Sequence, residues 1–437
     1  MKQIAKPNEF ILSILKKELP ANGSVIHISQ FCIQSGTLLF HTFTKEVLDL
    51  EDSLLKNEIV LSEENRNSEL INYMYTHQFY VREGINEAEV YCSTISAVRA
   101  LKRKKGLSGY TIIPTTFCNA RCFYCYELDY HFTSMSEETA DLLVSFIENT
   151  HGNNKVHLRW FGGEPLVGLP MIRRITSQLN QKRIIFDSYM ISNASLFTPE
   201  IAEEALTQWH LTRIQITLDG TKEEYLRRKA YFDHNERPHF EDVISAINEM
   251  QKNRVEVVLR LNVDFDNLQN HYELADQLKE MIPFRDRLVV HAAPLMQVMA
   301  SYRFREILEE CFRLQDYYRN LGFYIHTYRG FMKLKDYYCT AASLGGVSID
   351  PKGDIYTCEY CFEGEKLGNI SSTELKKRNQ TASLSDLLDK CVHCAFLPCC
   401  TEFTGCPEVN HKNCRQVNLQ MAEYMLKLLK DENPSIQ

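Results

Sequence analysis

Three cysteines, Cys118, Cys122 and Cys125, stand close together with three and then two residues between them. Thiolates looped this tightly ligate iron–sulfur clusters, and three of them on a four-iron cluster leave one iron without a protein ligand. Zinc is the alternative, but zinc usually takes four ligands in paired C-x2-4-C units, and no fourth Cys or His follows this triplet at such spacing. The spacing therefore indicates a four-iron cluster whose open iron can bind a small molecule.

This segment resembles the signature loop of the radical S-adenosylmethionine (SAM) superfamily, and Tyr124 takes the place of the aromatic residue before the third cysteine. The resemblance implies a [4Fe–4S] cluster on Cys118, Cys122 and Cys125, whose open iron is chelated by the amino and carboxylate groups of SAM. It also implies that one electron from this cluster cleaves SAM to methionine and a 5′-deoxyadenosyl radical. By the same resemblance Tyr124 lies against the cofactor.

Strands and helices must position this loop, and predicted strands and helices alternate along the chain. Strands are predicted at 110–114, 156–161, 184–191, 213–218, 255–262 and 288–291. Helices are predicted between them, one starting at the capping-box signature of 134–137 and running to about 149, and others at 170–179, 198–209 and 240–251. Six βα units predict an α/β fold with a parallel sheet curled into a partial (β/α)6 barrel, which binds ligands at the carboxyl ends of its strands.

The second predicted strand ends in a glycine pair followed by an acid, Gly162-Gly163-Glu164. Paired glycines let a backbone pass close to a ligand, and a carboxylate accepts hydrogen bonds from an ammonium group. Alone the segment could be a tight βα turn. One strand after the cysteine loop, it resembles the GGEP segment that holds the amino group of SAM in the superfamily.

Three other strand ends carry polar residues. Asn193 stands where the superfamily has an Asn near the ribose, although Ala194 replaces the usual Gly. Asp219 lies in a segment similar to the S/T-L-D-G motif of peptide-modifying members, and it could bind substrate, order its loop, or simply form a turn. Arg260 and Asn262 share one face of the fifth strand, where a guanidinium can pair with the SAM carboxylate or with an acid across the barrel mouth.

The end of the chain is rich in cysteine, and its spacing resembles the SPASM domain, which carries two auxiliary four-iron clusters. The resemblance implies one cluster on Cys391, Cys394, Cys400 and Cys414, and three ligands to the other from Cys339, Cys358 and Cys406.

Three alternatives stay open in this tail. The fourth ligand of the second cluster is either Cys361 or absent, which leaves an open iron for a substrate thiolate. Cys399 beside Cys400, together with five residues rather than three before Cys406, leaves the register of these thiols open. Paired C-x2-C units also form zinc ribbons, so zinc is an alternative metal.

The first hundred residues predict a separate unit. A helix at 8–17 precedes strands at 25–33, 37–40 and 46–50 and helices at 51–57 and 64–77, which suggests a winged-helix-like α+β unit. It resembles the precursor-peptide recognition element of peptide maturases, where a leader peptide adds a strand to a sheet edge. A plain extension packed on the core is the alternative. The predicted domains are therefore 1–100, a barrel at 101–300, and a bridging helix with the SPASM domain at 301–437.

The composition narrows the class of protein. The 437 residues are 44% apolar and 24% charged, as in ordinary globular proteins, and the formal charge of -8 argues against nucleic-acid binding. No signal peptide or membrane-spanning stretch is present, so a cytoplasmic location is expected, where thiols stay reduced. The basic run at 102–105 is either a solvated linker or a docking patch for an acidic electron donor.

Together these features predict a radical SAM/SPASM maturase that installs a thioether or carbon–carbon link in a ribosomally made precursor peptide. A flavodoxin- or ferredoxin-like protein would supply electrons. One alternative is an anaerobic sulfatase-maturing enzyme, which shares the core and the tail but forms formylglycine. An alternative of another class is a non-catalytic peptide-binding scaffold with zinc in the tail.

Overall fold

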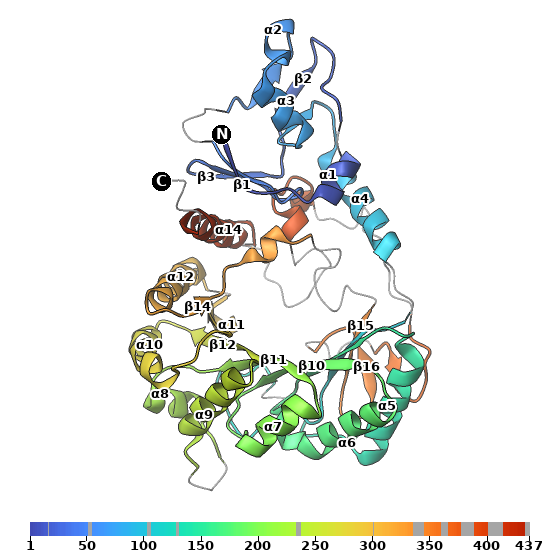
Figure 1. Ribbon diagram of the computed structural model, residues 1–437, viewed down its shortest axis with the longest axis vertical. Coiled ribbons are helices and arrows are strands. Elements are labelled where there is room, and N and C mark those ends of the chain that lie inside the picture. The colour runs from blue at the N-terminus through green and yellow to red at the C-terminus, as the bar shows by residue number, and fades with distance from the viewer. Residues whose placement is uncertain are drawn as a thin grey trace. The chain divides into compact units, whose positions relative to one another are not determined.

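The computed structural model describes residues 1–15, 17–50, 55–102, 106–127, 131–232, 237–299, 301–334, 345–359, 366–376, 389–400 and 414–432. The chain divides into two compact units (Figure 1). Here the terminal unit denotes Met1–Arg103 with Thr327–Cys339 and Gln380–Gln437, and the barrel unit denotes Lys104–His326 with Thr340–Asn379. The division falls inside the basic run at 102–105. None of the helices described here has both the length and the apolar content needed to cross a bilayer.

The barrel unit is built on one large sheet. Its strand order is β14-β13-β12-β11-β10-β9-β8-β15-β16-β17. The parallel strands are β8 (Gly109–Ile112), β9 (Val156–Trp160), β10 (Phe186–Ser192), β11 (Leu211–Thr217), β12 (Glu256–Val263), β13 (Leu288–Pro294), β14 (Tyr324–Ile325) and β15 (Gly346–Ile349). Two antiparallel strands, β16 (Asp354–Tyr356) and β17 (Gly368–Asn369), close the other edge. The prediction of a mostly parallel α/β sheet is therefore confirmed.

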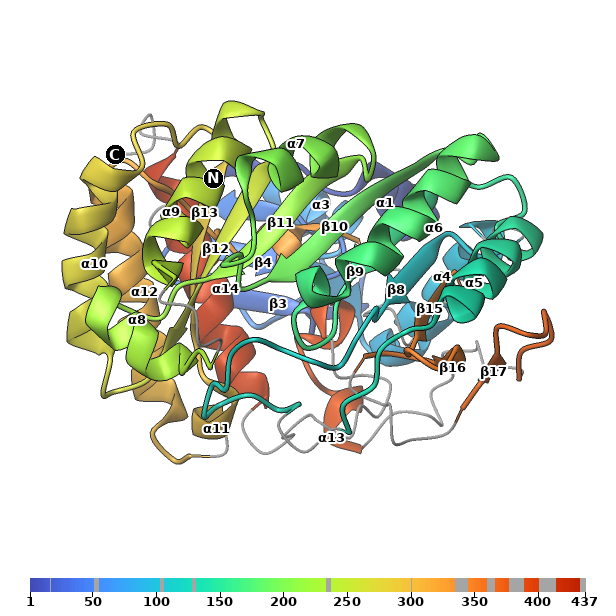
Figure 2. The same cartoon turned by 90° about the horizontal axis from the view of Figure 1, so that it is seen from below.

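Helices connect the strands and cover one face of the sheet, as Figure 2 shows for α5, α6, α7 and α9. Their bounds are α5 (Glu137–Thr150), α6 (Leu169–Gln181), α7 (Pro199–Thr207), α8 (Lys222–Lys229), α9 (His239–Lys252), α10 (Leu268–Met281), α11 (Met296–Met299) and α12 (Phe304–Asn320), with a 3-10 turn η1 (Pro165–Gly168) before α6. Strand residues facing the helices are buried, such as Leu158 and Trp160 of β9, whereas their alternate neighbour Arg159 is only half-buried. The sheet thus presents a polar inner face.

Most predicted elements of the barrel match the structure within a few residues, and the differences have local causes. Ser136, rather than Ser134, caps α5 by accepting a hydrogen bond from the Thr139 amide at 3.1 Å. Ser134 instead pairs with the hydroxyl of Thr115. Helices α8 and α10 were not predicted, because α8 is a short, highly charged segment whose apolar periodicity is weak.

The terminal unit contains two small antiparallel sheets. One has the order β1-β5-β4-β3, from β1 (Lys2–Ala5), β3 (Cys32–Ser35), β4 (Leu38–His41) and β5 (Val47–Asp49). The other has the order β6-β2-β7, from β2 (Val25–Ile28), β6 (Glu58–Val60) and β7 (Tyr80–Arg82). The helices are α1 (Glu9–Leu15), α2 (Glu63–Arg66), α3 (Glu69–Thr76), α4 (Glu87–Lys102), α13 (Asp389–Val392) and α14 (Cys414–Asp431), with 3-10 turns η2 (Arg329–Met332) and η4 (Leu397–Cys399).

Several details of this unit differ from the sequence prediction. The strand expected at 25–33 is two strands in different sheets, because the chain turns after Ile28. Of the helix expected at 51–57, residues 51–54 lie outside the described residues and 55–57 are not helical. Helix α4 was not predicted, although it supplies much of the local core.

That core joins the first hundred residues to the cysteine-rich tail. Phe31, Phe43 and Tyr91 pack edge to face, and Leu397 of η4 belongs to the same buried cluster. The hydroxyl of Thr42 donates to the carbonyl of Ala395 at 2.5 Å. The segment around η4 is therefore part of the core of the terminal unit.

Candidate active site

The cysteine loop leaves the carboxyl end of β8, as predicted for a ligand-binding loop of a parallel barrel. Cys118, Cys122 and Cys125 are half-buried thiols without a disulfide. The amide of Cys125 donates to the carbonyl of Cys122 at 3.0 Å, which forms the tight turn between them. Burial raises the pKa of Cys118 to about 12 and that of Cys125 to about 11. Thiolates in such a place need a nearby positive charge.

Arg121 holds the loop from within. Its guanidinium donates to the carbonyls of Cys118 and Ala120 at 2.7 and 2.8 Å and stacks against the ring of Phe232, 4.2 Å from its centroid. Its amide donates at 2.8 Å to the carbonyl of Lys229, at the end of α8. The loop is thereby tied to the helix that follows the fourth barrel strand.

The glycine pair lies directly against the cysteine loop. A Cβ atom added to Gly163 would fall 2.3 Å from the carbonyl oxygen of Phe117, and one added to Gly162 would fall 2.4 Å from that of Thr115. The amide of Glu164 donates to the Phe117 carbonyl at 2.8 Å. The close approach that the glycines allow is therefore to the backbone of the cysteine loop.

Glu164 is fully enclosed, with 1% of its surface exposed. Its Oε1 accepts hydrogen bonds from the Leu166 amide at 3.2 Å and the Ser192 hydroxyl at 2.7 Å, and its Oε2 accepts from the Asn193 amide at 2.8 Å. Burial raises the pKa of this carboxyl despite these three donors. Glu164 thus joins the ends of β9 and β10 and keeps one acceptor position on Oε2 for a further donor.

Asn193 is part of a buried polar network between β10 and the cysteine loop. Its Nδ2 donates to Oδ1 of Asn119 at 2.8 Å, and its Oδ1 accepts from the hydroxyl of Ser195 at 2.8 Å. Asn119 in turn donates to Ser195 at 3.0 Å. Ala194, which stands where the resemblance predicts a glycine, adopts a φ of 62°. The side chain of Asn193 is therefore held in place by the loop that carries Cys118.

Asp219 lies under the cysteine loop in a charged cluster that has no exposed carboxylate. Its Oδ2 accepts from Nζ of Lys229 at 2.9 Å and from the hydroxyl of Tyr124, and Lys229 also donates to the hydroxyls of Tyr124 at 3.0 Å and Thr217 at 2.7 Å. Burial alone would raise the pKa of Asp219, but Lys229 and Tyr124 hold it below its usual range. These contacts order the loop. A role in substrate binding stays a prediction.

Arg260 and Asn262 lie on the same face of β12, with Nε of Arg260 donating to Oδ1 of Asn262 at 3.1 Å. Across the sheet Arg260 pairs in register with Thr217 on one side and His291 on the other. Burial, reinforced by the charge of Arg260, keeps the pKa of His291 well below its usual value. A row of polar groups thus crosses the inner face at the carboxyl ends of the strands.

The residues of the loop fit an iron–sulfur cluster with bound SAM. The donors are three half-buried thiols on one loop, and the ammonium of Lys229 lies near enough to Cys125 to oppose the rise of its pKa. No group of three or more His, Cys, Asp or Glu within the described ranges is spaced to hold a single metal ion. A four-iron cluster does not require such spacing, because its thiolates bind different irons. Oε2 of Glu164 and the guanidinium of Arg260 offer an acceptor and a cation for an amino acid moiety.

The cysteine-rich tail is described only in part. Cys339, Cys361 and Cys406 lie outside the described residues. Cys358 follows β16 in the barrel unit, whereas the terminal unit contains Cys391 in α13, Cys394, Cys400 after η4, and Cys414 at the start of α14.

The two adjacent thiols of the tail lie in different surroundings. Cys399 is 4% exposed, and its Sγ accepts from Nζ of Lys45 at 3.1 Å and donates to the carbonyls of Thr42 and Phe331 at 3.5 and 3.6 Å. Cys400 is only half-buried. Cys399 is therefore enclosed by protein groups, whereas Cys400 is partly exposed.

Sequence reasoning missed the residues that support the loop, namely Arg121, Lys229, Asn119 and Ser195. The three basic residues that end α8 look like an ordinary complement to the helix dipole. Only the fold shows that Lys229 turns inward, where 2% of it is exposed.

Comparison with known proteins gives a family match for the barrel. Residues 112–278 match the model of the radical SAM superfamily. The chain is 23% identical over 165 residues to the radical SAM cyclopropyl synthase TigE of Paramaledivibacter caminithermalis, covering 34% of this chain and 35% of TigE. It is 24% identical over 275 residues to an uncharacterized protein of Methanocaldococcus jannaschii, covering 61% of this chain and 90% of that protein. The chain thus spans about a third of TigE.

Solved structures share the fold. One is anSMEcpe with bound AdoMet and a Cp18Cys peptide, with a TM-score of 0.56 and 18% identity, covering 76% of this chain and all of that one. Another is Streptococcus suis SuiB bound to S-adenosylmethionine, with a TM-score of 0.51 and 14% identity, covering 90% of this chain and 99% of SuiB. SuiB bound to its precursor peptide SuiA also matches, with a TM-score of 0.50.

Proposed function

We propose that the chain, whose residues 112–278 match the radical SAM superfamily, is an enzyme of that superfamily and a maturase of a ribosomally made peptide. In this proposal Cys118, Cys122 and Cys125 hold the [4Fe–4S] cluster that binds SAM. When bound, these groups supply a 5′-deoxyadenosyl radical, which takes a hydrogen atom from the substrate. The protein must position the cofactor against one C–H bond and exclude water and oxygen.

Residues at neighbouring strand ends would hold SAM. Glu164 accepts hydrogen bonds from the amino group at the free position on Oε2, and Arg260 with Asn262 binds the carboxylate. Asn193, at the end of β10, would lie near the ribose. Gly162 and Gly163 keep the end of β9 against the cysteine loop. Tyr124 would contact the cofactor from the loop itself. Lys229 and Asp219 fix Tyr124, and Asp219 is also our candidate for contact with substrate.

The cysteine-rich tail would hold two auxiliary clusters and take up the electron left on an oxidised substrate. We assign Cys391, Cys394, Cys400 and Cys414 to one cluster. Cys339, Cys358 and Cys406 supply the other, with Cys361 or an open iron as its fourth site. Net oxidation of this kind produces an intrachain thioether or carbon–carbon link.

The terminal unit would bind the leader of the precursor peptide. Its small antiparallel sheets have edges that can accept a strand. A flavodoxin- or ferredoxin-like protein would deliver electrons to the barrel. Two of the similar structures contain peptides, which supports a peptide substrate.

One observation carries the proposal: three thiols on one loop at the carboxyl end of a parallel barrel, held there by Gly163, Glu164 and Lys229. The test is anaerobic reconstitution with iron and sulfide, followed by reduction in the presence of SAM. We expect a brown protein that produces 5′-deoxyadenosine. Co-expression with candidate precursor peptides should then yield a mass loss of two hydrogens per crosslink. A colourless zinc protein that leaves SAM intact would refute the proposal.

The sulfatase-maturing alternative has one observation in its favour, the TM-score of 0.56 to anSMEcpe. That likeness covers 76% of the chain, whereas the SuiB fold covers 90% of it. A leader-binding unit explains the additional residues, and a sulfatase peptide would not need one. Conversion of a sulfatase peptide to formylglycine, with no modification of leader-bearing peptides, would favour the alternative.

A further inference from the structure

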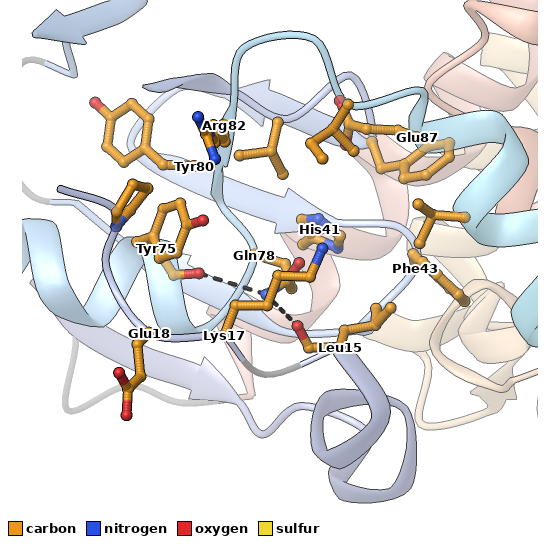
Figure 3. A pocket seen from close by; sticks show the side chains of 15 residues that line it. Leu15, Lys17, Glu18, His41, Phe43, Tyr75, Gln78, Tyr80, Arg82 and Glu87 are labelled. Atoms are coloured by element: carbon orange, nitrogen blue, oxygen red, sulfur yellow. Dashed lines mark hydrogen bonds between the residues drawn. The ribbon is translucent and has the colours of Figure 1, made fainter. Parts of the chain in front are cut away.

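Charged side chains on the inner face of the barrel sheet are open to solvent. The side chain of Arg213 on β11 is 49% exposed, and that of Arg159 on β9 is 30% exposed. The terminal unit differs, since its cavity of about 270 Å³ has mainly apolar walls and His41 beside that cavity is 1% exposed (Figure 3). A soluble ligand can therefore reach the charges of the barrel face, but not the polar ring beside the cavity.

Arg213 reaches the inner face because the register of β11 against β10 slips by one residue. Ser188 pairs with Leu211, but the next residue of β10, Tyr189, pairs with Arg213, so that Thr212 is an extra residue. Side chains alternate between the two faces of a strand, and one extra residue reverses the facing of those that follow. Arg213 is thereby turned away from the face of the buried Leu211 and onto that of Tyr189.

Tyr189 lies between two arginines of neighbouring strands. It pairs in register with Arg159 of β9 and with Arg213 of β11. The guanidinium carbons of these arginines lie 5.7 and 5.5 Å from the centroid of the tyrosine ring. Stacking on an aromatic ring orients a guanidinium while its N–H groups can still donate hydrogen bonds. We call Arg159, Tyr189 and Arg213 the arginine row.

Each arginine of the row already has one acidic neighbour. Nη1 of Arg159 lies 2.8 Å from Oε1 of the buried Glu359. Glu127 lies on the same side, where burial and then the charge of Glu359 raise its pKa to about 7. Nε of Arg213 lies 3.1 Å from Oε1 of Glu256, its one ion-pair partner within the described ranges. The Arg213 end of the row thus has fewer carboxyl groups, and its guanidinium can bind a further one.

The charges that act on the sheet beyond Arg213 are positive. Burial, followed by the charges of Arg213 and Arg260, lowers the pKa of His326 to about 4. The His326 ring stacks on that of His291, 4.2 Å away between centroids, and both rings are neutral at pH 7 because burial also keeps the pKa of His291 low. This local field opposes the formal charge of -8 on the whole chain. An acidic group is therefore favoured at this place, although the protein as a whole repels one.

The arginine row lies closer to the amino ends of the strands than the residues proposed to hold SAM. Arg260 pairs in register with Thr217, which stands four residues after Arg213 on β11. At about 3.3 Å per residue, Arg213 and Thr217 lie about 13 Å apart along the strand. An extended peptide spans this distance with about four residues. A peptide with one residue beside SAM thus reaches Arg213 with a residue about four positions away.

We propose that Arg213 and Arg159 bind a carboxylate of the substrate peptide, from an acidic side chain about four residues from the position that is modified. Tyr189 holds the two guanidiniums in place for it. This inference rests on the proposed function, since it names the class of peptide that the barrel selects. The alternative is an ion pair of Arg213 with Glu256 that only stabilises the fold, in which case acidic and neutral peptides would bind equally.

The test uses the reconstituted chain with SAM and three rhodamine-labelled hexapeptides that differ only in two central residues, which are glutamates, glutamines or lysines. Fluorescence anisotropy measures their dissociation constants. We expect the glutamate peptide to bind about tenfold more tightly than the glutamine peptide, and the lysine peptide to bind most weakly. In Arg213→Gln the preference for glutamate should fall to about twofold or less. Arg173→Gln should keep it, and is the matched control because Arg173 is 50% exposed and pairs with Glu204 on the outer helices.

Glu256→Gln should change the affinity in the opposite direction, which a folding defect cannot imitate. The substitution removes the carboxylate that competes for Arg213, so the glutamate peptide should bind about threefold more tightly. Melting temperatures check that each variant is folded. No measurable binding of the glutamate peptide, equal affinities of the parent for the glutamate and glutamine peptides, or an unchanged preference in Arg213→Gln would overturn the inference.

Production of 5′-deoxyadenosine by the parent preparation separates this inference from the proposed function. A parent that cleaves SAM but does not prefer the glutamate peptide refutes only the carboxylate site at Arg213. A parent that leaves SAM intact refutes the proposed function, whatever its affinity for the peptides.

Discussion

The two groups of cysteines in this chain are positioned in different ways. Cys118 to Cys125 lie on a single loop of the barrel unit, fixed by hydrogen bonds to α8 and to the residues that follow β9 and β10. The tail cysteines come from both units, with Cys358 in the barrel unit and Cys391, Cys394, Cys400 and Cys414 in the terminal unit. A loop site is specified by short spacing in the sequence, whereas the tail cysteines stand far apart in the sequence.

The contrast extends to what surrounds the thiols. The cysteine loop is supported by buried charged and polar groups, chiefly Lys229, Asp219 and Asn193, which hold its backbone. In the tail, η4 is packed by apolar side chains, and Lys45 donates to Cys399. Substitutions in the loop should therefore affect SAM cleavage and the order of the loop together. Substitutions in the tail can affect cluster binding without affecting the local packing, or the reverse.

The largest effect is expected at the loop. Cys122→Ala removes one of three cluster ligands, so 5′-deoxyadenosine production should fall below detection and iron content should drop by about one cluster per chain. Cys92→Ala, which alters a buried thiol of the terminal unit, is the control and should keep both. Retained SAM cleavage by Cys122→Ala would refute the assignment of this loop as the binding site of the SAM-cleaving cluster.

The adjacent thiols of the tail sharpen the contrast. Cys400→Ala should remove about a third of the iron, since one of three clusters loses a ligand, and should abolish peptide modification while SAM is still cleaved. Cys399→Ala should keep its iron and lose only about 1 kcal/mol of stability, because its thiol is enclosed by protein. Iron analysis and peptide mass spectrometry distinguish them. The reverse pattern would shift the ligand register by one residue.

Much of the barrel could be predicted from the sequence because its signals are local. Strands such as 156–161 and 255–262 are short segments rich in apolar residues, and the motifs stand in or just after the last residues of such strands. The fold then brings Glu164, Asn193, Asp219 and Arg260 to one end of the sheet, as parallel topology requires. Their contacts were not predictable, since hydrogen bonds such as that between Glu164 and Ser192 join segments 28 residues apart.

The terminal unit was harder to predict for a physical reason. Its strands are three or four residues long, and such short elements give little periodicity. Gln78, just before strand β7, has a left-handed backbone conformation, which a glutamine does not predict. Its core needs Leu397 from the far end of the chain, and no pattern in the first hundred residues reveals that partner.

A third prediction tests the charged support of the loop. Lys229→Met leaves the carboxylate of Asp219, which is fully buried, without its cation, so unfolding free energy should fall by about 3–5 kcal/mol. The double variant Lys229→Met with Asp219→Asn removes both charges and should recover part of that loss. Chemical denaturation of the apoprotein measures both. A loss below about 1 kcal/mol in the single variant would mean that the pair does not support the loop.

The smallest effect concerns the contact between the glycine pair and the cysteine loop. In Gly163→Ala the new Cβ would fall 2.3 Å from the Phe117 carbonyl oxygen, so the two backbone segments must separate. We expect a loss of about 1–3 kcal/mol and weaker SAM binding, because the shift moves Glu164 and the cysteines together. Gly109→Ala is the matched control, since the nearest atom to its added Cβ lies at 3.6 Å. Equal denaturation midpoints and equal SAM affinities for the two variants would show that the loop tolerates displacement. In that case the order of the loop would come from its contacts with Lys229, and the glycine pair would not be needed to support the cysteines.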